Sequence, residues 1–155
     1  MRPRMLAAMA CAAAMLISFA AAQAPGGSSS PNYIPHLGDI MGATQLRHFK
    51  LSFAGKLRNW DLAAYELEQI VESFQDAATL YPGIPVTDMT IVADPVRRLR
   101  EAIEKKDSQK FSAAFNELTV ACNGCHQAIG RGFILIQVPT SSPFSNQIFE
   151  PAAKP

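Results

Sequence analysis

The sequence predicts an all-α protein, an up-down-up-down four-helix bundle with a C-terminal extended tail. Four stretches between residues 37 and 130 carry apolar residues three or four positions apart, the spacing of a helix with one buried face. Capping residues, Gly and Pro separate these stretches. Four amphipathic helices without an internal repeat bury their apolar faces by packing together as a bundle.

The chain begins with a stretch typical of a secretory signal peptide, predicted for residues 1–22. Two arginines precede an apolar segment over residues 6–19, and a run of alanines before Gln23 provides a small-residue cleavage site. That segment is too short to span a membrane, and no later apolar stretch reaches the required length. Cys11 lies in the leader, so the mature chain keeps only Cys122 and Cys125. We expect a secreted, periplasmic protein with no membrane span in the mature chain.

The charge of the mature chain is nearly balanced. Without the two arginines of the leader, 12 basic and 13 acidic residues remain, a net charge of about −1. No run or stripe of Lys and Arg is present, which argues against nucleic acid as a partner. The remaining length suffices for a single hydrophobic core.

The first half of the mature chain is expected to hold an arm and two helices. Residues 23–36 are rich in Pro, Gly and Ser and are predicted to form a flexible arm. The first helix is predicted over residues 37–54, and the second over residues 62–80 after a capping Asn59 or Asp61. The acidic residues of the second helix, Glu66 among them, are assigned to its solvated face.

The third helix is predicted to start at Asp94-Pro95, a capping Asp with Pro at the first helical position, and to end near Lys106. A long loop would precede it. The fourth begins at Asp107 or Ser108 and ends at Gly130, which completes a bundle domain over residues 37–130. Its apolar stripe comprises Phe111, Phe115, Leu118, Cys122, Cys125 and Ile129. Several prolines make residues 131–155 a non-helical tail, whose apolar part, 133–138, is expected to pack back on the bundle.

The fourth helix carries Cys122-Asn123-Gly124-Cys125-His126, a C-x-x-C-H run, which is the attachment signature of a c-type haem. Each thiol adds across a porphyrin vinyl group to form a thioether, and the histidine becomes an axial ligand of the iron. Residues three apart share a helix face, so the two thiols lie together. We expect one covalently attached haem c, held by Cys122, Cys125 and His126.

Other interpretations of the two cysteines need features that the sequence lacks. A zinc site takes four ligands, and His36 and His48 do not have the spacing of a ligand pair. A thioredoxin-like site needs its first cysteine at a helix N-terminus, whereas about four helical turns precede Cys122. A disulfide between residues three apart would strain a helix. A structural zinc or disulfide module is therefore only a remote alternative.

Two residues of the first helix, Met41 and His48, lie on its apolar stripe and are candidates for the opposite axial ligand. They are about 10 Å apart along the axis, so only one can reach the iron. In an up-down bundle the first helix is antiparallel to the fourth, which places its N-terminal end, and Met41, beside His126. The ordinary alternatives are a core methionine and a hydrogen-bonded core histidine.

Residues 37–130 resemble the class II c-type cytochromes, which comprise cytochrome c prime and its methionine-ligated low-spin relatives. The resemblance is carried by the helix order, residues 107–111, Leu118 and the motif near the end of the last helix. It implies that a methionine near the start of the first helix binds iron, which favours Met41. The chain departs from the family at Gly130, where a basic residue is common, and in the tail.

These observations predict a mono-haem cytochrome that carries single electrons between redox partner proteins and is not an enzyme. A thioether opposite an imidazole raises the potential and keeps the iron low-spin, which suits electron transfer. If neither Met41 nor His48 binds, the resemblance to cytochrome c prime implies a five-coordinate iron that binds nitric oxide or carbon monoxide.

Overall fold

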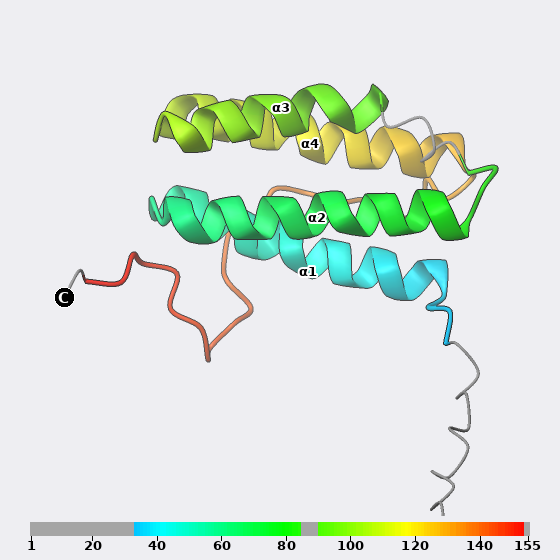
Figure 1. Cartoon of the computed structure of the whole chain (residues 1–155), viewed down its shortest axis with the longest axis horizontal. Coiled ribbons are helices and arrows are strands. Elements are labelled where there is room, and N and C mark those ends of the chain that lie inside the picture. The colour runs from blue at the N-terminus through cyan, green and yellow to red at the C-terminus, as the bar shows by residue number, and fades with distance from the viewer. Residues whose placement is uncertain (1–32, 85–89, 154–155) are drawn as a thin grey trace, which may run out of the picture. The chain divides into compact units, whose positions relative to one another are not determined.

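The computed structural model describes residues 33–84 and 90–153, and the helices in this part form an up-down-up-down four-helix bundle (Figure 1). They are α1 (Leu37–Lys56), α2 (Trp60–Leu80), α3 (Thr90–Glu104) and α4 (Ser108–Ala128). The predicted fold class is thereby confirmed. The predicted leader and residues 23–32 of the predicted arm lie outside the described residues. No helix in the described part is long and apolar enough to cross a membrane.

The bundle consists of two tightly packed helix pairs, α1 with α2 and α3 with α4. Contacts between α1 and α4, which run antiparallel, are much sparser (Figure 1). The core between the pairs is built from fully or almost fully buried apolar side chains, among them Leu51, Leu67, Ile70, Leu99, Phe115 and Leu118. Their burial is the main stabilising contribution to this fold.

The end of α1 and the start of α4 approach each other closely at Gly55. A Cβ atom at this position would overlap the ring of Phe111 on α4. Trp60 packs edge-on against the same ring, with the ring centroids 6.0 Å apart. Gly55 thus lets α1 and α4 pack closely at this end, and a pocket lies between them at the opposite end, near the start of α1 and the end of α4.

Capping residues define the N-terminal ends of α2 and α4, as the sequence predicted. The side chain of Asn59 accepts a hydrogen bond from the backbone N–H of Leu62 at the start of α2. Asp107 accepts two, from the N–H groups of Gln109 and Lys110, at the start of α4. Both satisfy backbone donors that have no partner within the helix.

The predicted start of α3 at Asp94-Pro95 is wrong, because the helix begins at Thr90 and contains Pro95. Proline there lacks the N–H that would bond to the carbonyl of Ile91. The extra turn buries Val92, which is 5 % exposed and belongs to the core, and this burial offsets the lost hydrogen bond. Asp94 pairs with Arg97 instead of capping the helix.

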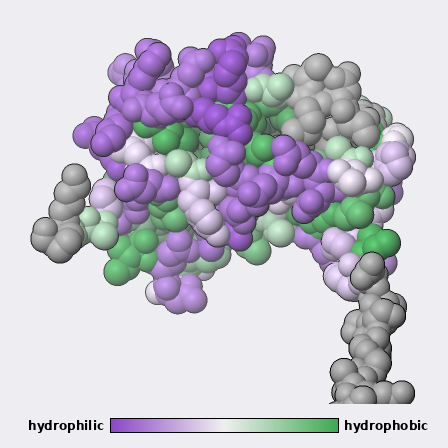
Figure 2. Space-filling model, viewed as in Figure 1, coloured by the Kyte–Doolittle hydropathy of each residue, from purple (hydrophilic) through white to green (hydrophobic). Residues whose placement is uncertain are grey.

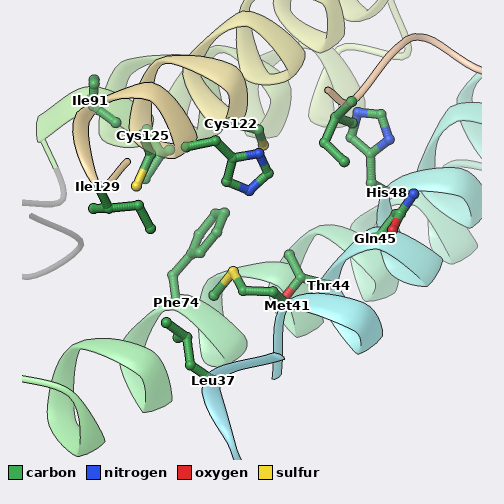
Figure 3. A pocket seen from close by; sticks show the side chains of 13 residues that line it. Leu37, Met41, Thr44, Gln45, His48, Phe74, Ile91, Cys122, Cys125 and Ile129 are labelled. Carbon is green, nitrogen blue, oxygen red and sulfur yellow. The ribbon is translucent and has the colours of Figure 1, made fainter. Parts of the chain in front are cut away.

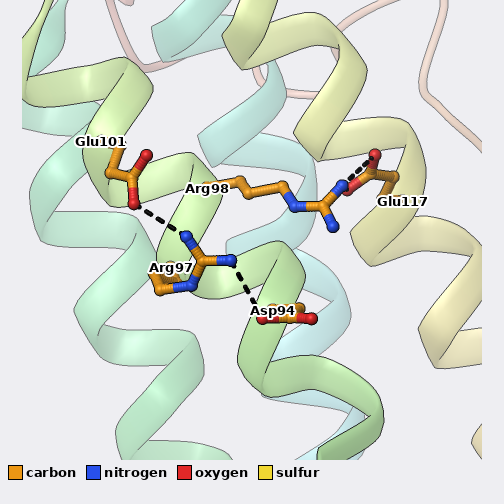
Figure 4. A network of polar contacts seen from close by, with 5 residues as sticks. All are labelled: Asp94, Arg97, Arg98, Glu101 and Glu117. Atoms are coloured by element: carbon orange, nitrogen blue, oxygen red, sulfur yellow. Dashed lines mark hydrogen bonds and ion pairs between the residues drawn. The ribbon is translucent and has the colours of Figure 1, made fainter.

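The outer face of α3 carries a network of ion pairs (Figure 4). Arg97 bridges Asp94 at 3.1 Å and Glu101 at 2.9 Å, and Arg98 contacts the carboxylate of Glu117 on α4 at 2.8 Å. Hydrophilic residues dominate this side of the molecule (Figure 2). Exposed pairs of this kind contribute little to stability, so the network mainly keeps this face solvated.

Glu66 was assigned to the solvated face of α2, and this assignment is wrong. Its side chain is buried, with the residue 1 % exposed, and it accepts a 3.1 Å hydrogen bond from Arg47 of α1. A buried carboxylate needs a partner, and the guanidinium of Arg47 provides one across the α1–α2 interface. The acidic pattern of α2 did not reveal the pair because the partner lies on another helix.

The described part of the tail, residues 131–153, contains no helix or strand and contacts the bundle at several points (Figure 1). Lys56 and Asn59 donate hydrogen bonds to the carbonyls of Pro139 and Glu150, and Phe149 is buried. The expectation that residues 133–138 pack on the bundle holds only for part of the segment. Val138 packs against the core, whereas Phe133 and Leu135 are 79 % and 75 % exposed.

Candidate functional site

A pocket lies between the N-terminal half of α1 and the C-terminal end of α4 (Figure 3). Its empty volume, part of which is open solvent, is about 740 Å³. The residues that line it are Leu37, Met41, Thr44, Gln45, His48, Phe74, Ile91, Val92, Cys122, Cys125, His126, Ile129 and Ile136. The pocket therefore brings together all the site residues that the sequence predicted.

The two motif cysteines lie on the α4 wall of the pocket, across from Met41 of α1 (Figure 3). Both are free thiols. Burial raises the pKa of Cys122 to about 12, with a smaller contribution from Cys125, and burial also raises the pKa of Cys125. Protonated thiols are poor redox nucleophiles, so the pair is unlike the low-pKa cysteine of a thioredoxin-type site.

His126 is half-buried at the end of α4, and its Nδ1 lies 2.8 Å from the carbonyl oxygen of Ile134 in the tail. A carbonyl oxygen only accepts hydrogen bonds, so Nδ1 must carry the proton. The neutral imidazole then has its lone pair on Nε2. This is the arrangement of a metal-binding histidine, whose second nitrogen donates to a carbonyl or carboxylate.

His48 also lines the pocket, but its Nε2 is engaged by Thr119 of α4 at 2.9 Å. The Thr119 hydroxyl donates to the carbonyl of Phe115, so it accepts a hydrogen bond from Nε2–H of His48. The imidazole is 3 % exposed and lies 4.4 Å from the Phe115 ring, centroid to centroid. His48 thus has the contacts of a hydrogen-bonded core histidine, which was the alternative to iron ligation.

We expect the buried His48 to make the protein acid-sensitive. Burial lowers its pKa from 6.5 to about 4, so the unfolded chain takes up the proton first as the pH falls. The contribution of neutral His48 to the free energy of unfolding is fully present above pH 6.5. It is lost as the pH falls towards 4, by roughly 3 kcal/mol in total. Urea unfolding at several pH values across this window measures the loss. The free energy of unfolding of a His48→Phe variant should depend less on pH in this window. The same pH dependence as in the wild type would show that His48 does not cause the acid sensitivity.

The donor set of the pocket fits a haem c. It combines two thiols, an imidazole whose Nε2 is free to bind metal, a thioether at Met41 and walls that are almost entirely apolar. Among residues 33–84 and 90–153, no three His, Cys, Asp or Glu side chains are grouped to hold a metal ion. Cys122, Cys125, His126 and Met41 are the residues that could hold the haem.

Sequence reasoning missed some of the residues that shape this site. Ile91 was placed in a loop, and the backbone carbonyl of Ile134 leaves no signal in a sequence. Phe74 of α2 also lines the pocket, where it lies across from Cys125 (Figure 3). Ile136 belongs to the apolar tail segment that was expected to pack back on the bundle.

Comparisons of the chain with family models, with curated proteins and with solved structures found no match. The case for a function therefore rests on the residues of the pocket and their chemistry.

Proposed function

We propose that this protein is a mono-haem c-type cytochrome that carries single electrons between redox partner proteins. One observation carries the proposal. The C-x-x-C-H residues Cys122, Cys125 and His126 line an apolar pocket opposite Met41, and the Nδ1 of His126 is already hydrogen-bonded, which leaves Nε2 for a metal.

The residues have distinct roles in this proposal. Cys122 and Cys125 would hold the porphyrin through thioethers, and His126 and Met41 would bind the iron. The bound haem supplies the one-electron redox chemistry. The apolar walls exclude water and provide a low dielectric around the site, which tunes the potential.

The resemblance to the methionine-ligated class II c-type cytochromes supports electron transfer as the role, and the leader predicted for residues 1–22 supports a periplasmic location. His48 is held by Thr119, which leaves Met41 as the preferred ligand opposite His126. The alternative is a five-coordinate site that binds nitric oxide or carbon monoxide, favoured if Met41 is only a packing residue.

A reduced-minus-oxidised visible spectrum of the mature protein, made in cells that mature c-type cytochromes, tests the proposal. We expect the sharp bands of a low-spin c-type haem after reduction. A spectrum of five-coordinate iron would favour the gas-binding alternative, and a colourless protein would contradict both.

A further inference from the structure

The chain reverses direction directly after the motif, through a capping structure that involves His126 itself. The N–H of Arg131 donates to the carbonyl of His126 at 2.7 Å, and the N–H of Gly130 donates to that of Gln127 at 3.2 Å. Gly130 has φ +69°, the left-handed conformation that this Schellman motif requires. A turn from Arg131 to Ile134 follows, closed by a 2.8 Å backbone hydrogen bond. Residues 131–136 are thereby directed back along α4, and we call this segment the strap.

Two side chains of α4 bind the strap, those of Asn123 and His126. The Asn123 amide donates to the carbonyl of Ile136 and accepts from its N–H, both at 2.8 Å. This pairing satisfies both backbone groups of one residue, as a neighbouring β-strand would. Two residues before Ile136, the carbonyl of Ile134 accepts from Nδ1 of His126.

We propose that the strap fixes the proton position and orientation of the His126 imidazole, and that Asn123 is the positioning residue that holds the strap in place. The ligand role of His126 rests on the function proposed above. Asn123 stands between the two cysteines of the motif, so the strap is tied to the same helical turn that would hold the haem. Ile136 lines the pocket, which makes the strap part of its wall.

The side-chain amide of Asn123 provides both the donor and the acceptor that bind the backbone of Ile136. Alanine at position 123 would remove both hydrogen bonds, and aspartate would keep the acceptor for the Ile136 N–H but lose the donor to its carbonyl. The exposed neighbours of Ile136, such as Leu135, bury too little apolar surface to hold the strap alone. Loss of Asn123 therefore frees the Ile134 carbonyl from His126.

The test compares the full mature chain with Asn123→Ala, Asn123→Asp and the control Asn116→Ala, an exposed asparagine on the same helix. Amide hydrogen exchange and ¹⁵N NMR of the imidazole are measured on each protein before haem is attached, because bound iron would occupy Nε2 and hold the Nδ1–H form in every variant. We expect Asn123→Ala to lose the protection of the Ile136 amide and to shift His126 away from the Nδ1–H tautomer. Asn123→Asp should retain part of the Ile136 protection, and Asn116→Ala should retain all of it.

In the haem-loaded protein, Asn123→Ala should also raise the midpoint potential, because an imidazole without its hydrogen bond is a weaker donor to oxidised iron. If the wild type takes up no haem, the proposed function fails, and the tautomer and exchange measurements still decide the role of the strap. An unchanged His126 tautomer in Asn123→Ala, with the Ile136 amide deprotected, would overturn the inference.

Discussion

Replacing both motif cysteines, Cys122→Ser with Cys125→Ser, should abolish covalent haem attachment completely. Acid–acetone extraction should leave the colour with the wild-type protein and remove all of it from the double variant, because serine forms no thioether. Each single variant should keep at most one thioether. Both thiols line the same pocket and are free, so each is available for attachment.

The control for this experiment is Val120→Ser, at a position of α4 that is 70 % exposed and does not line the pocket. It introduces serine on the same helix and should retain the full covalent haem content. Release of all the colour from the wild type would contradict covalent attachment. Equal haem retention in the double variant and the wild type would show that the cysteines are not the attachment sites.

Met41→Ala should convert the iron from low-spin to high-spin and make the ferrous form bind carbon monoxide readily. Met41 is half-buried at the N-terminal end of α1, lines the pocket and lies across it from the motif cysteines (Figure 3). Its thioether would be the sixth ligand, so its loss opens a coordination position. The wild type should show a weak sulfur-to-iron band in the far red, and the variant should lack it.

Two further variants separate ligation from packing. Met41→Leu keeps the apolar volume without the sulfur and should show the same spectral change as Met41→Ala. Leu37→Ala removes apolar volume from the same wall of the pocket and should stay low-spin. If the wild type is already high-spin and binds carbon monoxide fast, Met41 is only a packing residue and the gas-binding role takes precedence.

Helix boundaries were predicted well where the signal is local. The Asn59 and Asp107 caps and the stop at Gly130 depend on hydrogen bonds within a few residues, so their side chains identify them. The start of α3 was mispredicted because the strong local signal of Asp94-Pro95 is overridden by the burial of Val92 in the core. Burial of that kind depends on neighbouring helices.

The sequence by itself determined the four helices, their antiparallel order and the motif, and it placed Met41 of the first helix beside His126 of the last, where the pocket lies. Only the tertiary structure decided the partners of the polar groups around that pocket. His48 is paired with Thr119, which is 71 residues away, and His126 is paired with a backbone carbonyl of the tail. The periodicity of a sequence shows which face of a helix is buried. The hydrogen-bond partner of a buried polar group depends instead on how distant segments pack. Each such group bonds to the donor or acceptor that this packing brings within reach.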